Sequence, residues 1–123
     1  MWKFIIRQNV EGKIDYILRA EDGRIILQSK AYSSDNACRK GIASVTKNSR
    51  TSHLEDHAVE GIVKEVKHPK YELYQAQDGG SYFQLKASNG QIVGISEVYK
   101  SKEECLEGIA ELRKQGPAAV VDD

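Results

Sequence analysis

The stretch LKASNGQIVGISEVYKSKEECLEGI, residues 85–109, decides the fold because the chain contains it twice. Its earlier copy is LRAEDGRIILQSKAYSSDNACRKGI, residues 18–42. A shift of 67 positions aligns residues 4–56 with residues 71–123 without a gap, and fifteen aligned positions are identical. Such repetition predicts that each copy is one supersecondary unit, too small to bury its apolar face alone.

Length and composition favour one globular domain of 123 residues, with a first repeat at 4–56, a linker at 57–70 and a second repeat at 71–123. The N-terminus has only a short apolar run before charged residues, so it lacks the apolar core of a secretory signal. No window approaches the length of a membrane span. The two cysteines occupy equivalent repeat positions and are interpreted as reduced thiols. These features predict a cytoplasmic protein with no membrane association.

The formal net charge is zero, with +2 on residues 4–56 and −4 on residues 71–123. Proteins that neutralise many phosphates concentrate lysine and arginine on one face. A balanced charge without such a concentration therefore gives nucleic acid binding no support.

Each copy begins with a pattern typical of a β-hairpin. In the first copy, residues 3–8 and 14–20 are β-rich runs separated by a turn at Gly12. Apolar residues alternate along the second run, so we expect Tyr16 and Leu18 to face the core.

A third strand follows a tight turn in each copy. The turns are predicted at Asp22-Gly23 and Asn89-Gly90, where glycine best tolerates a positive φ. The third strands are predicted at residues 24–30 and 91–97. Burial is predicted for six repeat-equivalent residues: Leu18, Ile25, Ile42, Leu85, Ile92 and Ile109.

A helix follows the third strand in each copy. Ser34 and Ser101 are expected to cap the helix N-termini, and Glu104 completes a capping box in the second copy. Gly41 and Gly108 fall on the apolar stripe of each helix. Because glycine inside a helix costs about 1 kcal/mol relative to alanine, we predict that these glycines allow close packing.

Both copies contain three motifs in the same order: [LI]-[KR]-A-x-[ND]-G-x-I, S-x-x-Y-x-S and C-x-x-G-I-A. In these motifs the sequence resembles the YegP-like family of small uncharacterised prokaryotic tandem-repeat proteins. The resemblance implies an α+β fold in which two tandem β-β-β-α units form one antiparallel sheet with helices packed on one face. It also implies exchange of the helix between units, and it brings no known activity. The pair Val120-Val121 further suggests a short extended tail along the sheet. The linker at 57–70 is compatible with a helical turn or with a continued strand.

Candidate sites for metal or catalysis have simpler structural interpretations. His53 and His57 could bind zinc together if they were helical, but Leu54 stands where the metalloprotease pattern requires glutamate, and only His68 or a carboxylate could be a third ligand. Cys38 and Cys105 fall on the inward helix stripes, whereas a reactive thiol needs exposure.

The remaining candidates also indicate structure. The repeated serines are interpreted as capping and strand-end residues because no histidine recurs with them; these are Ser29, Ser34, Ser96 and Ser101. Gly79-Gly80 lacks the spacing and the lysine of a phosphate-binding loop. We therefore predict no catalytic, cofactor-binding or metal-binding residue.

The sheet face opposite the helices is predicted to be unusually apolar for a solvated surface. The candidate interaction residues on it are Ile17, Ile26, Tyr74, Tyr82, Val93 and Ile95. Either a partner or the linker and tails could cover this face. If it is a free face, Ile26→Glu with Val93→Glu should leave the fold intact and abolish association.

The sequence does not identify a biochemical activity. The first hypothesis is a non-enzymatic binding or interaction module, which uses this face for a protein partner or for self-association. The alternatives are a small enzyme with an unrecognised site, or a single-stranded nucleic acid binder that uses aromatics such as Tyr74 and Tyr82.

Overall fold

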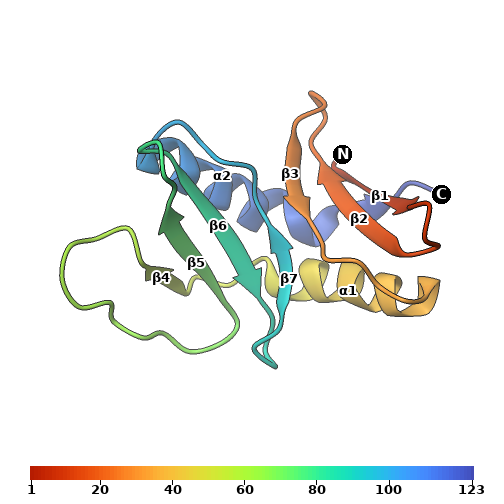
Figure 1. Cartoon of the computed structure of the whole chain (residues 1–123), viewed down its shortest axis with the longest axis horizontal. Helices are drawn as coiled ribbons and strands as arrows, with labels where there is room; N and C mark the ends of the chain where they lie inside the picture. Colours follow the sequence, from red (N-terminus) through yellow and green to blue (C-terminus); the bar gives the residue numbers. More distant parts are fainter.

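The computed structural model describes residues 1–123 and contains one eight-stranded sheet and two α-helices, a mixed α+β fold (Figure 1). The elements in chain order are β1 (Lys3–Gln8), β2 (Ile14–Arg19), β3 (Ile25–Gln28), α1 (Asp35–Asn48), β4 (Leu54–Asp56), β5 (Lys70–Gln75), β6 (Ser81–Lys86), β7 (Ile92–Ile95), α2 (Lys102–Gln115), the 3-10 helix η1 (Gly116–Ala118) and β8 (Val120–Val121). The strand order across the sheet is β4-β5-β6-β7-β3-β2-β1-β8.

The six central strands pair with one another in antiparallel fashion, as expected. The two outermost strands are each parallel to the strand beside them. At one edge β4 pairs with β5, and at the other β8 pairs with β1. The predicted extended tail at Val120-Val121 is confirmed as β8. Each short edge strand therefore pairs with the first strand of the other half of the chain.

Local sequence signals place the turns and helix starts correctly. Gly23 and Gly90 have φ values of +91° and +83°, which confirms the two predicted tight turns. The hydroxyl oxygens of Ser34 and Ser101 accept hydrogen bonds from backbone N–H groups three residues later, which confirms both N-caps.

The two helix glycines pack against tyrosine rings rather than against the sheet backbone. A Cβ atom added to Gly41 or Gly108 would overlap the hydroxyl of Tyr32 or Tyr99, respectively. These tyrosines stack on the core rings of Tyr16 and Phe83. The predicted close packing is confirmed, and its partner is an aromatic side chain.

Both helices lie on one face of the sheet (Figure 1). Helix α1 contacts β2, β6 and β7, and α2 contacts β5 and β6. The core lies between the two layers, and its members include Leu18, Ile42, Leu85 and Ile109, which confirms four of the six predicted buried residues.

At the centre of the core, the side chain of Leu27 fills space that the repeat-equivalent Gly94 leaves. A Cβ atom on Gly94 would lie 3.0 Å from Leu27 Cδ1. The two halves of the chain therefore contribute unequal volumes at this position.

The other two predicted buried residues, Ile25 and Ile92, are not in the core. In the pairing of β2 with β3, one residue is skipped after Ile25, and in the pairing of β6 with β7 one is skipped after Ile92. Each irregularity is a β-bulge, which changes the face on which the neighbouring side chains lie. Ile25 is consequently half-buried and Ile92 is 39% exposed.

The segment after β4 contains no helix or strand until Lys70 begins β5. Residues 57–69, which we call the strap, form the long loop between these two strands in Figure 1. Neither alternative predicted for this linker, a helical turn or a continued strand, occurs in the strap beyond Asp56, the last residue of β4. None of the helices has the length and apolar character needed to cross a lipid bilayer.

Candidate functional site

The candidate functional site is the sheet face that points away from the helices, which we call the outer face. Strand pairing defines it: Ile5 pairs with Ile17, and Ile17 with Gln28, out of phase with the core residues. The same alternation pairs Gln84 with Ile95 across β6 and β7. The face has a polar half on β4, β5 and β6 and an apolar half on β1, β2, β3 and β7.

The structure places four of the six predicted interaction residues on the outer face. Tyr74 and Tyr82 pair across β5 and β6, and their rings stack with centroids 5.5 Å apart. Ile17 is only 2% exposed because neighbouring side chains cover it, whereas Ile95 is 43% exposed.

The other two, Ile26 and Val93, were wrongly placed on the outer face by simple alternation. Both occupy the bulge positions of their strands and belong to the hydrophobic core, with exposures of 1% and 5%. Glutamate at both positions would therefore bury two carboxylates and unfold the protein. The bulges instead bring Ile25 and Ile92 to the outer face.

The polar half contains a cluster of buried and half-buried ionisable groups, the ionic cluster, formed by Glu55, His57, Lys70, Glu72 and Lys86. The ammonium group of Lys70 lies 2.7 Å from Glu55 Oε1 and 3.3 Å from Glu72 Oε2. Lys86 Nζ lies 3.1 Å from Glu72 Oε1, and His57 Nε2–H donates to Glu55 Oε2 at 2.6 Å. Two carboxylates are thus neutralised by two ammonium groups.

The environment stabilises the charged forms of Glu55, Glu72 and Lys70. Burial raises the pKa of Glu55, but hydrogen bonds from Lys70, from the Val66 N–H and from His57 outweigh burial and lower the pKa to about 2. Burial likewise raises the pKa of Glu72, and the hydrogen bonds from Tyr74 and Lys86 lower it overall. Burial lowers the pKa of Lys70, but the two carboxylates raise it overall.

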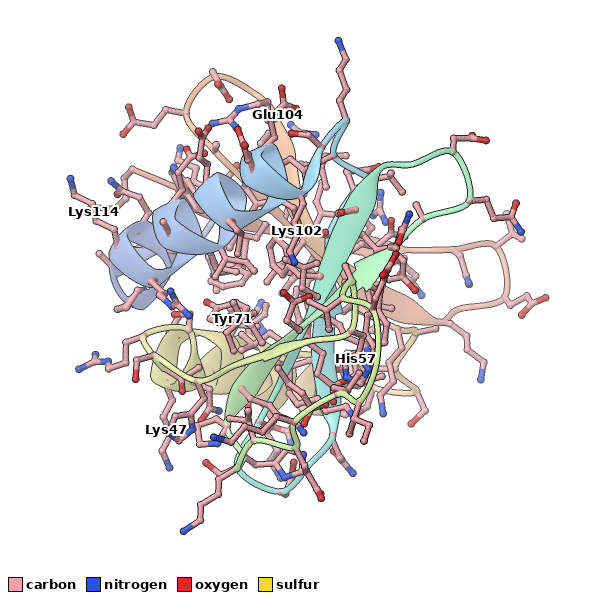
Figure 2. All side chains as sticks on the ribbon, turned by 90° about the vertical axis from the view of Figure 1, so that its left-hand side faces the viewer. Lys47, His57, Tyr71, Lys102, Glu104 and Lys114 are labelled. Carbon is pink, nitrogen blue, oxygen red and sulfur yellow. The ribbon has the colours of Figure 1, made fainter.

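The strap covers the ionic cluster. The Val66 N–H donates to Glu55 Oε1 at 2.9 Å, and His53 Nδ1 lies 2.9 Å from the carbonyl oxygen of Lys67. The His57 ring stacks on Tyr74 with centroids 4.6 Å apart. Figure 2 shows this side of the molecule. The strap, which begins at His57, passes in front, and Tyr71 lies between the two helices. The strap therefore lies over this half of the outer face and leaves a cavity of about 370 Å³, lined by the five cluster residues together with Val63, Glu65 and His68.

One group of side chains has ligand atoms close enough to hold a metal ion: Glu55, His57 and Glu72, within 4.8 Å of one another. The helix on which His53 and His57 could have bound zinc together is not formed, because strand β4 lies between them. Lys70 contacts both carboxylates, so a divalent cation at this position would have to displace a buried ammonium group.

The cysteines and serines have the predicted structural roles. Cys38 and Cys105 are free, buried thiols, and burial raises the pKa of both, that of Cys105 to about 11. The hydroxyls of Ser29 and Ser96 accept hydrogen bonds from backbone N–H groups of β2 and β6 and donate to the next carbonyl. Gly79 has a φ of +81° in the turn between β5 and β6.

The apolar half is dominated by the junction of β3 and β7, which we call the seam. These strands share a single residue pair, Gln28 with Ile95, and in Figure 1 they meet only at their C-terminal ends. A cavity of about 420 Å³ lies at the seam, lined by Gln28, Ser29, Lys30, Ile92, Gly94, Ile95, Ser96 and Glu97. The seam is therefore a hollow on the outer face with isoleucines in its wall and one charge of each sign.

Sequence reasoning missed both the ionic cluster and the seam. The signal for the cluster was present, since Lys70 and Glu72 alternate with the core residues Tyr71 and Leu73 along β5. No sequence signal marks the seam, because the single residue pair between β3 and β7 depends on packing between the two halves.

Known proteins similar to this chain share its whole length. Residues 10–56 and 76–123 each match the family model described as "Domain of unknown function (DUF1508)". The UPF0339 protein ACIAD0721 of Acinetobacter baylyi is 35% identical over 118 residues, which cover 96% of this chain and 92% of the relative. The UPF0339 protein YegP of Escherichia coli K12 is 32% identical over 120 residues, covering 98% and 94%.

Two solution NMR structures have a similar fold. The UPF0339 protein SO3888 of Shewanella oneidensis superposes with a TM-score of 0.79 at 25% identity, over 99% of this chain and 90% of that protein. The yegP protein of Escherichia coli, described as a protein of unknown function, superposes with a TM-score of 0.76 at 31% identity, over 99% of this chain and 91% of that protein.

Proposed function

The chain belongs to the DUF1508 family, whose description names no activity, and from this premise we propose that it is a non-enzymatic binding module whose contact surface is the apolar half of the outer face. The family match bears out the resemblance to YegP-like proteins. Of the interaction residues predicted from the sequence, Ile95 lies at this surface and Tyr74 and Tyr82 lie at its border, whereas Ile17 is on the same sheet face but buried. Ile25 and Ile92 join this surface.

The observation that carries the proposal is the difference between the two halves of one sheet face. The strap covers the polar half, whereas on the apolar half Ile92 and Ile95 are 39% and 43% exposed beside the seam cavity. Val98, next to the same seam, is 61% exposed. Contiguous exposed apolar groups on a protein surface commonly mark an interaction site.

We further propose that residues 4–56 and 71–123 are tandem β-β-β-α units joined by the linker at 57–70, and that the protein acts in the cytoplasm. The parallel pairing of β4 with β5 and of β8 with β1 supports an exchange of chain ends between units. The two separate family matches support the tandem arrangement.

An enzymatic role for the ionic cluster has less support. A general acid or base works best when its pKa lies near the working pH. Here the pKa of Glu55 is lowered to about 2 and that of Lys70 is raised, so both shifts move away from neutrality. Such shifts are those of an ion-pair network that stabilises structure.

Single-stranded nucleic acid binding also has less support. It requires free aromatic faces next to unpaired basic groups. Tyr74 is stacked between His57 and Tyr82, and the nearby Lys70 and Lys86 contact carboxylates.

The test is the double variant Ile92→Glu with Ile95→Glu, compared with Ile62→Glu. Ile62 is 97% exposed on the strap and is a matched apolar-to-acidic control outside the proposed surface. We expect the double variant to keep its thermal unfolding midpoint. It should no longer self-associate in sedimentation velocity, and it should no longer capture from native lysate any protein that the wild type captures. The control should keep both. If the double variant keeps every partner and the same mass in solution, the apolar half is not the contact surface.

A further inference from the structure

We infer that the surface proposed above binds a second copy of this chain, through a symmetric contact in which Lys30 of each copy meets Glu97 of the other. The inference rests on the proposed function, because it assigns a partner to the same surface. It starts from the seam pair, Gln28 with Ile95. These two residues are 67 positions apart, the repeat offset, so the approximate twofold axis that relates the two halves passes between them.

The same operation relates Lys30 to Glu97, which are also 67 positions apart. Both side chains are exposed, both line the seam cavity, and neither belongs to any ion pair within the chain. Lys30 lies two residues beyond Gln28, and Glu97 lies two residues beyond Ile95. At a rise of about 3.3 Å per residue, these four residue steps separate the two charges by roughly 13 Å along the antiparallel strands.

Equivalent positions with opposite charge make the seam complementary to itself. In a twofold dimer, residue i of one copy contacts residue j of the other, and j contacts i. We consider a twofold axis that lies in the contact plane and is perpendicular to the line from Lys30 to Glu97. Rotation about this axis places Glu97 of the second copy over Lys30 of the first, and Lys30 of the second copy over Glu97 of the first. Ile95, beside the internal axis, then lies close to Ile95 of the second copy at the centre.

Two other charged groups near the seam already have ion-pair partners. Arg24, at the Glu97 end, contacts Asp22 and Glu111, and Lys86, next to Ile92, contacts Glu72. Lys30 and Glu97 are the charged residues that line the seam cavity, and the Lys30 ammonium also lies 5.7 Å from the centroid of the Tyr32 ring. The resulting contact has Ile95 and Gln28 near its centre and one complementary ion pair at each end, so that the charged groups lie at the rim, as is usual in specific protein interfaces.

The experiment is a charge-reversal series followed by sedimentation velocity. We expect wild type to dimerise, and Lys30→Glu and Glu97→Lys each to weaken dimerisation by at least about tenfold, because each variant places like charges together at both ends of its own dimer. An equimolar mixture of the two variants should form a heterodimer, since every pair is then opposite in charge. The double variant Lys30→Glu with Glu97→Lys should dimerise like wild type.

The matched control is Lys47→Glu, an exposed charge reversal on α1 at the helix side of the sheet, which should leave dimerisation unchanged. A monomeric wild type, or single reversals without effect, would overturn the inference. It is equally overturned if both single variants lose dimerisation and neither the mixture nor the double variant restores it. If self-association is absent but Ile92→Glu with Ile95→Glu still removes a different captured protein, the proposed surface stands and only the second copy is rejected.

Discussion

Replacing Lys70 by methionine tests whether the buried ionic cluster holds the β4 side of the sheet together. Lys70 is 5% exposed, and its ammonium group contacts Glu55 and Glu72, whose side chains are 6% and 4% exposed. Methionine keeps the length of the side chain and removes the charge. Glu72 would keep its contact with Lys86, whereas Glu55 would have no lysine partner.

Removal of one partner from a buried ion pair costs about 3–5 kcal/mol. Glu55 keeps the hydrogen bonds from His57 and Val66, and Glu72 keeps those from Tyr74 and Gln84. We therefore expect the lower end, about 3 kcal/mol, because both carboxylates retain other donors. For a chain of this size that corresponds to a decrease in unfolding midpoint on the order of 10 °C.

The repeat supplies the control, Lys3→Met. Lys3 is the equivalent of Lys70 in the first half, on β1, but it is exposed and makes no ion pair, so we expect a change within about 0.5 kcal/mol. Urea unfolding followed by circular dichroism and by Trp2 fluorescence gives both free energies, and coincident transitions justify a two-state analysis. Adding Glu55→Gln to Lys70→Met should recover part of the loss, since it removes the buried carboxylate that has lost its lysine partner. If Lys70→Met is no less stable than Lys3→Met, or if Glu55→Gln lowers stability equally in both backgrounds, the cluster does not stabilise the fold as reasoned.

Three further predictions follow from the core and the ionic cluster. Gly108→Leu should destabilise the fold by about 1–3 kcal/mol in thermal unfolding, because its Cβ would overlap the Tyr99 hydroxyl, and an unchanged midpoint would contradict that packing. Cys38 and Cys105 should react with a thiol reagent much more slowly in the native protein than in denaturant, since burial raises the pKa of each; equal rates would mean exposed thiols. The lowered pKa of Glu55, about 2 against an ordinary 4.5, contributes stability above pH 4.5 that is lost as the pH falls towards 2, and this loss in acid titration should be smaller in Glu55→Gln.

Local features of the fold could be predicted from the sequence because they depend on a few neighbouring residues. The turns at Gly23 and Gly90 need a positive φ, and the caps at Ser34 and Ser101 need only a hydroxyl next to the first helical turn. The repeat made each signal stronger, since it occurs twice at the same offset.

The register of β3 and β7 could not be predicted in this way. A bulge arises where two strands pair, so it is not visible in the sequence of one strand. Strict alternation therefore placed Ile25 and Ile92 on the core face and Ile26 and Val93 on the outer face, the reverse of the structure. The parallel edge strands also depend on pairing between distant segments.

The candidate site was predicted only in part, for the same reason. Ile17 and Ile95 follow from alternation before and after the bulges. The burial of Lys70 and Glu72 depends on the strap, which a pattern of neighbouring residues does not reveal.

The unequal pair Leu27 and Gly94 has a consequence for how the gene can change. Near an internal twofold axis a residue packs against its own duplicate, so the two copies must share one volume between them. Recombination that copies one half of the gene onto the other would place two leucines there and overpack the core, or two glycines and leave a void. Although fifteen positions are identical, the two halves are therefore no longer interchangeable. We expect the codons for Leu27 and Gly94 to stay different from each other, and a change in one to be accompanied by a compensating change in the other.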